Sequence, residues 1–96
     1  MQIVDLGQQL SVSIDEPFAV DVKNGGLSGA SWTVVLPDGV ALIKKTTTPA
    51  GQMGGGPKRQ YVFRCQRSGD FNLKFELKRP WEPQGKTKEM VIHCLP

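Results

Sequence analysis

Few residues of this chain have the types and spacing that catalysis requires. His93 is the only histidine, and nothing in the sequence requires a serine or cysteine nucleophile to lie beside it. A lone histidine is more often a surface or hydrogen-bonded residue than a general base. The acidic residues are scattered through turns and polar strand faces, so no carboxylate pair is indicated. We therefore expect no catalytic residue and no enzyme.

The two cysteines, Cys65 and Cys94, are too few for a zinc site. Each falls on the apolar phase of an alternating stretch, beside Phe63 in one case and Ile92 in the other. We favour two small core residues over a disulfide, because bridging two strands makes strict demands on geometry. The disulfide stays open as the alternative.

The glycine-rich segments lack the sequence of a phosphate-binding loop. The run from Gly51 to Gly56 is followed by neither a Gly-Lys-Ser/Thr motif nor a helical pattern, and Gly25-Gly26 fails the same test. No cofactor and no metal are expected.

Composition describes one ordinary globular domain spanning residues 1–96, with 39% hydrophobic and 22% charged residues. The net charge of +3 is mild and the basic residues lack interleaved aromatics, so we expect an acidic protein partner rather than nucleic acid. No apolar window is long enough to cross a membrane. We expect a monomer, which is cytoplasmic unless a leader precedes this sequence, in which case it is periplasmic or secreted.

Period-two alternation of apolar and polar residues runs through most of the chain, and no amphipathic helix or repeat interrupts it. The expected strands cover residues 3–6, 10–14, 18–23, 32–36, 40–45, 61–65, 71–78 and 90–94. Seven to eight short strands with polar outer faces predict an all-β, immunoglobulin-like antiparallel β-sandwich.

The connections divide by length. If successive strands run antiparallel, one end of the sandwich receives the minimal turns at 15–17, 37–39 and 68–69. The other end receives three long loops, at 24–31, 46–59 and 79–87. Because long loops on a rigid scaffold commonly carry binding residues, we expect the functional site at that end.

Trp81 stands in the third of these loops, between Pro80 and Pro83. Proline cannot continue a ladder, so the preceding strand should stop near Pro80. A tryptophan on a stiff loop is either an anchor for a partner's pocket or a cap that folds back over the core. The stretch by itself favours the cap.

Taken with the three loops, the motif Arg79-Pro80-Trp81 gives the chain a resemblance to the chagasin family of cysteine peptidase inhibitors. The family carries N-P-T-T-G-x-x-W in its first loop, G-x-G-G in its second and R-P-W or R-P-F in its third. Gly29 and Trp32 match the first motif, although the proline is missing and Leu27-Ser28 replaces the two threonines. The second loop is richer in glycine than the family's pattern.

The resemblance implies a reversible, tight-binding inhibitor that occludes the cleft of papain-like peptidases with three loops. The peptidase-binding residues that it implies are Gly26, Leu27, Ser28, Gly29, Gly54, Gly55, Gly56, Arg79, Pro80 and Trp81. Two alternatives remain open. One is an immunoglobulin-like adhesion or carbohydrate-binding module in which Trp81 stacks on a sugar. The other is a structural domain whose glycine-rich loops are flexible connections without a binding role.

Overall fold

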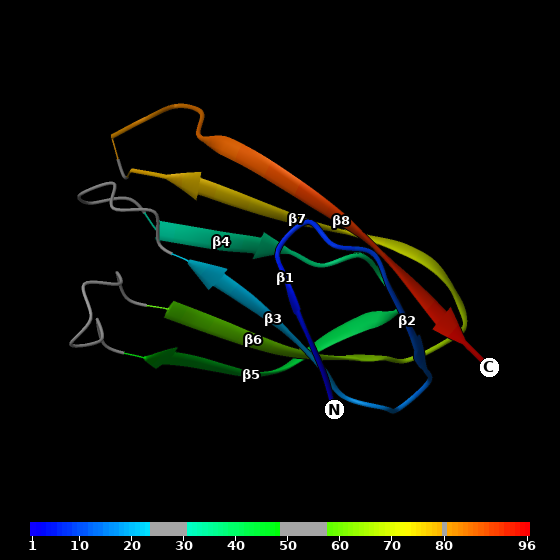
Figure 1. Ribbon diagram of the computed structural model, residues 1–96. Helices are drawn as coiled ribbons and strands as arrows, with labels where there is room; N and C mark the ends of the chain where they lie inside the picture. The colour runs from blue at the N-terminus through cyan, green and yellow to red at the C-terminus, as the bar shows by residue number, and fades with distance from the viewer. Residues whose placement is uncertain (24–30, 49–57, 80) are drawn as a thin grey trace.

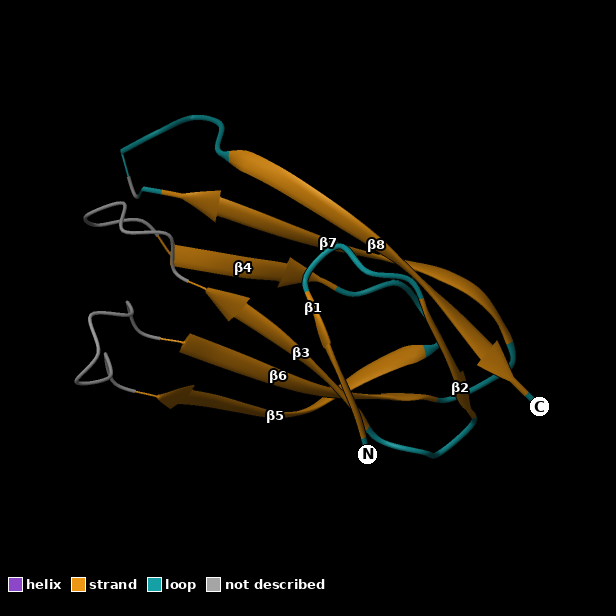
Figure 2. Ribbon diagram, viewed as in Figure 1, coloured by secondary structure: helices purple, strands orange, loops and turns teal. Residues whose placement is uncertain are grey.

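The computed structural model describes residues 1–23, 31–48, 58–79 and 81–96, which form eight β-strands in two sheets (Figure 1). The strands are β1 (Gln2–Asp5), β2 (Leu10–Ser13), β3 (Phe18–Lys23), β4 (Ser31–Val35), β5 (Val40–Thr48), β6 (Lys58–Cys65), β7 (Gly69–Lys78) and β8 (Lys86–Leu95). One sheet has the order β1-β3-β6-β5 and the other β2-β8-β7-β4. Figure 2 shows strands and loops only among the described residues, and the predicted all-β sandwich is confirmed.

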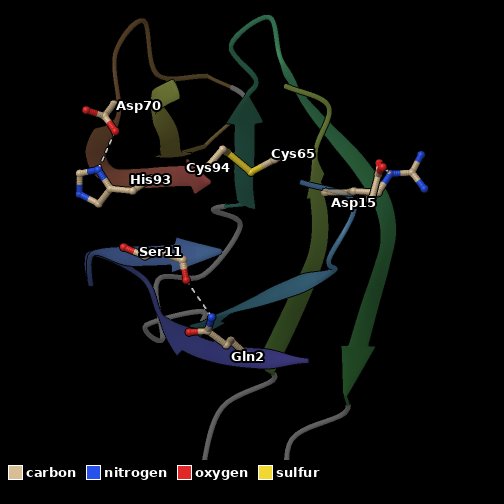
Figure 3. The surroundings of a disulfide bond; sticks show 8 residues. Gln2, Ser11, Asp15, Cys65, Asp70, His93 and Cys94 are labelled. Carbon is tan, nitrogen blue, oxygen red and sulfur yellow. Dashed lines mark hydrogen bonds and ion pairs between the residues drawn. A yellow bond between two sulfur atoms is a disulfide. The ribbon is translucent and has the colours of Figure 1, made fainter. Parts of the chain in front are cut away.

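Not all neighbouring strands are antiparallel. β1 pairs with β3 and β2 pairs with β8 in parallel, while the other four pairings are antiparallel as predicted. The first two strands lie at the edges of opposite sheets, so each meets a strand that is not its sequence neighbour. The side-chain amide of Gln2 donates a 2.8 Å hydrogen bond to the carbonyl oxygen of Ser11, which ties these two edges together (Figure 3).

The core lies between the sheets and is built from the alternating apolar residues. Its buried members are Leu10, Val12, Phe18, Val20, Val22, Val40, Tyr61, Phe63, Cys65, Leu73, Phe75, Met90, Ile92 and Cys94. Aromatic rings join the two sheets, because Phe75 of β7 meets Tyr61 of β6 edge-on at a centroid distance of 5.6 Å. Such packing between rigid rings gives the strands a firm mutual position.

Several predicted boundaries were wrong. The last strand was predicted over 90–94 and the third loop over 79–87, but β8 already begins at Lys86, so this connection covers 79–85. The segment 46–59 is not loop throughout, because β5 continues to Thr48 and β6 begins at Lys58. The pairing of β5 with β6 has a register shift between Leu42 and Lys44, an irregularity that a strict two-residue alternation does not predict. The strand predicted over 32–36 includes Leu36, but β4 ends at Val35 and Leu36 is 36% exposed.

Cys65 and Cys94 form a disulfide that joins β6 to β8 across the sandwich (Figure 3). Their Cα atoms are 6.0 Å apart, within the range that a disulfide spans. The expectation of two unbonded core cysteines was therefore wrong. Alternation correctly placed both thiols on inward faces, but it cannot show that the ends of β6 and β8 lie opposite each other.

Candidate functional site

The strand ends that flank the three long connections lie at one end of the sandwich, opposite both termini (Figure 1). In one sheet, Lys58 at the start of β6 is the register partner of both Lys23, which ends β3, and Thr48, which ends β5. In the other sheet, Ser31 at the start of β4 pairs with Lys78, which ends β7. The predicted gathering of the long connections at one end is confirmed.

The opposite end holds the short turns and the disulfide. Gly39 in the turn between β4 and β5 has φ +107°, and a Cβ there would lie 2.7 Å from the ring of Phe71. Only glycine adopts this backbone without strain at such a close approach. The carbonyl oxygen of Gly39 also accepts a 2.7 Å hydrogen bond from the backbone N–H of Gln66. The chain at this end of the sandwich is therefore closely packed and hydrogen-bonded.

Tyr61 and Trp32 connect the two sheets near the strand ends that flank the long connections. Tyr61 is 2% exposed, and its hydroxyl donates to the carbonyl oxygen of Trp32 over 3.5 Å. Trp32 is half-buried and packs against the core. Because this contact joins β6 to β4, it fixes the relative position of the two strand starts at which the first and second long connections end.

A braced turn follows β7. The backbone N–H of Glu82 donates a 3.1 Å hydrogen bond to the carbonyl oxygen of Arg79. In return, the Glu82 carboxylate accepts a 3.0 Å hydrogen bond from the backbone N–H of Arg79 and lies 3.5 Å from its guanidinium. The two residues hold each other through backbone and side chain, so the turn that they enclose is preorganised.

Gly85 sets the path by which the chain returns to the sheet. A Cβ at Gly85 would collide with the carbonyl oxygen of Leu77 and would lie 2.7 Å from the Cβ of Lys78. The connection thus passes directly against the last residues of β7, and only a residue without a side chain fits there. Sequence reasoning did not single out this glycine.

Trp81 points away from the protein. Trp81 is 72% exposed, the largest value among the exposed large hydrophobic residues of the described chain. The interpretation that Trp81 folds back as a cap on the core is therefore wrong. A large aromatic side chain exposed on a braced turn has the properties of a binding anchor.

Most of the other predicted site residues lie outside the described residues. These are Gly26, Leu27, Ser28, Gly29, Gly54, Gly55, Gly56 and Pro80. Arg79 and Trp81 are described, and they lie at the same end as the strand ends that flank the remaining connections.

His93 has a partner that the sequence did not reveal. Its Nδ1 lies 2.7 Å from a carboxylate oxygen of Asp70, and Ser11 is its register partner on β2 (Figure 3). Ser11, His93 and Asp70 are neighbours across three strands, but they do not form a catalytic triad, because the aspartate of such a triad is buried. The Asp70 side chain is 73% exposed.

No group of three or more histidine, cysteine, aspartate or glutamate residues that could hold a metal ion occurs in the described parts of the chain. Within the same residues, no helix is long and apolar enough to span a membrane.

Comparisons with known proteins identify the family. The model of "Chagasin family peptidase inhibitor I42" matches residues 11–94. No curated protein sequence matches the chain significantly. Among solved structures, the cysteine protease inhibitor EhICP2 from Entamoeba histolytica superimposes with a TM-score of 0.80 at 17% identity, over 98% of this chain and 94% of that one.

Two further structures share the architecture. Amebosin gives a TM-score of 0.72 at 13% identity, over 99% of both chains. PbICP-C, solved in complex with falcipain-2, gives 0.62 at 14% identity, over 97% of this chain and 89% of that one. At such identities the likeness establishes a common fold.

Proposed function

This chain belongs to the chagasin family of peptidase inhibitors, and we propose that it is a reversible, tight-binding inhibitor of papain-like cysteine peptidases. It is an inhibitor and not an enzyme, and its three long connections occlude the peptidase's active-site cleft. The structural neighbour PbICP-C, which was solved in complex with falcipain-2, supports this class of partner.

The observation that carries the proposal is the exposed Trp81 on the turn braced by Arg79 and Glu82, at the end from which all three long connections leave. A monomer does not gain stability by leaving a tryptophan 72% exposed. Trp81 therefore contributes to binding rather than to folding, and it packs on the aromatic surroundings of the peptidase's catalytic histidine.

The other two long connections complete the surface that enters the peptidase cleft together with the Trp81 turn, which we call the wedge. Leu27, Ser28 and Gly29 lie across the catalytic cysteine of the peptidase without presenting a bond for cleavage. Gly54 to Gly56 let the second connection approach the cleft closely, since glycine has no side chain to intrude. Interfaces of inhibitors with peptidases typically bury about 800 Å² per partner, and a preformed wedge loses little entropy on binding.

A titration against papain and a cathepsin L-type peptidase tests the proposal, with hydrolysis of a fluorogenic peptide as the readout. We expect reversible inhibition at nanomolar to micromolar protein, with the inhibitor recovered intact. Absence of inhibition at tens of micromolar would refute the proposed function.

Trp81→Ala tests the role of the anchor. Removing an aromatic hot spot costs about 2 kcal/mol or more, so we expect an inhibition constant at least about thirtyfold higher. The effect should exceed that of any single change in the segment 24–30. Leu95→Ala is the matched control, because Leu95 is 47% exposed at the opposite end and should leave inhibition unchanged. Equal inhibition constants for the wild type and Trp81→Ala would exclude Trp81 as an anchor.

A further inference from the structure

Basic residues gather where the strands meet the long connections. Lys23 and Lys58 are direct register partners, and Lys78 and Lys86 occupy the last two rows of the other sheet. We call the basic residues of the last two register rows and of the connection at 79–85 the cationic collar. Its members are Lys23, Lys58, Arg59, Lys78, Arg79 and Lys86.

The collar has little compensating negative charge. Glu82 is the one acidic residue among the same rows and that connection, and it is paired with Arg79. The collar region therefore carries +5, whereas the whole chain carries +3. The remaining residues include six basic and eight acidic ones, so the rest of the molecule carries −2. The molecule is polarised, with its positive end at the long connections.

The opposite end differs in both the sign and the pairing of its charges. Asp15, Asp38 and Asp70 lie in or beside its turns. Its two arginines are both paired there, Arg64 with Asp15 at 3.8 Å and Arg67 with Asp38 at 3.2 Å. The molecule measures 41 Å in its longest dimension, several times the Debye length of about 8 Å at physiological salt. A partner approaching the long connections therefore experiences the collar and not the acidic end.

The charges stand at the strand ends that flank the contact segments in the sequence, and not within those segments. Segments 24–30 and 49–57 contain no charged residue. Basic residues at the strand ends, beside segments without charge, indicate a role in attracting a partner to the long connections.

We propose that the peptidase target carries a predominantly acidic rim around its active-site cleft, and that the cationic collar selects and steers this partner. The inference rests on the proposed function and specifies the partner within it. Charges at the rim of an interface raise the association rate, while the uncharged central contacts govern dissociation. Papain-like peptidases with neutral or basic rims bind the same wedge more slowly.

Association kinetics test this proposal. The association and dissociation rate constants are measured by surface plasmon resonance at 20, 150 and 500 mM NaCl, against whichever peptidase of a papain-like panel the chain inhibits best. The variants are Lys86→Gln and Lys78→Gln/Lys86→Gln. Arg64→Gln is the control for one lost positive charge, because Arg64 lies six residues from Lys58 along β6, roughly 20 Å away.

We expect the wild-type association rate to fall about tenfold or more between 20 and 500 mM NaCl. The double variant should associate about three- to tenfold more slowly at 20 mM, lose most of that difference at 500 mM and keep its dissociation rate. Arg64→Gln should match the wild type, and neutralising rim carboxylates on the peptidase should reproduce the loss.

Several results would overturn the inference while leaving the proposed function intact. They are inhibition with a salt-independent association rate, an equal effect of Arg64→Gln and Lys86→Gln, and a preference for peptidases with basic rims. Inhibition of no peptidase at any salt concentration would instead remove the proposed function. Micromolar binding of duplex DNA at 150 mM NaCl in that case would assign the collar to nucleic acid.

Discussion

At the scale of single residues, Glu82 and Arg79 decide how Trp81 is presented. The Glu82 carboxylate accepts from the Arg79 backbone N–H at 3.0 Å and lies 3.5 Å from the guanidinium, while the Glu82 N–H returns a bond to the Arg79 carbonyl. A loop held in its bound conformation loses less entropy on association. The pair therefore contributes to affinity without having to contact the peptidase.

Glu82→Ala should weaken inhibition about three- to tenfold, the equivalent of one or two lost hydrogen bonds, because the turn becomes free to move. The melting temperature should stay close to the wild type, since the pair lies outside the core. Glu82→Gln keeps an acceptor for the Arg79 N–H and should lose less. Inhibition assays and thermal unfolding measure both effects, and an unchanged inhibition constant for Glu82→Ala would show that the brace is dispensable.

At the scale of elements, the connection between β7 and β8 depends on the close contact of Gly85 with the end of β7, which the sequence of either strand does not predict. Gly85 passes against Leu77 and Lys78 so closely that any side chain would collide with them. The alternation of β7 predicted where that strand runs and ends, but not that the returning chain would lie against it.

Gly85→Ala should shift this connection and lower both stability and inhibition. We expect a loss of about 1–3 kcal/mol in the free energy of unfolding, the usual cost of overpacking, measured by urea denaturation. Gln84→Ala is the neighbouring control, because Gln84 is exposed and should tolerate the change. Wild-type stability and inhibition for Gly85→Ala would contradict the tight approach that the structure shows.

At the scale of the whole molecule, the sandwich separates a stabilising end from a binding end. The disulfide Cys65–Cys94 and the short turns lie at one end, and the long connections, Trp81 and the collar at the other.

Reduction of the disulfide should lower stability and leave inhibition in place. The bridge spans 29 residues, and closure of a loop of that size stabilises a fold by about 3–4 kcal/mol. For a domain of this length, that corresponds to a fall in melting temperature of about 15–25 °C. Calorimetry with and without reductant measures the fall, and Cys65→Ala/Cys94→Ala serves as a second form without the bridge. A marked loss of inhibition at 25 °C in protein that remains folded would contradict the separation of the two ends.

Much of the fold follows from local pattern. Phe71 to Leu77 alternate because one face of β7 lies in the core, and Pro37-Asp38-Gly39 marks a turn through its backbone preferences. Because successive strands were expected to run in opposite directions, the three long connections were then predicted to lie at one end of the sandwich. Arg79-Pro80-Trp81 marked the site in the third connection.

Only the tertiary structure decided which distant residues meet. It brought Cys65 to Cys94, Gly85 to Leu77, and Lys23 to Lys58. It also turned Trp81 outward, against the interpretation that its own stretch favoured. Local sequence determines the face that a side chain takes, because the period of a strand is two residues. It does not determine which strand lies opposite, because that depends on the packing of the two sheets together.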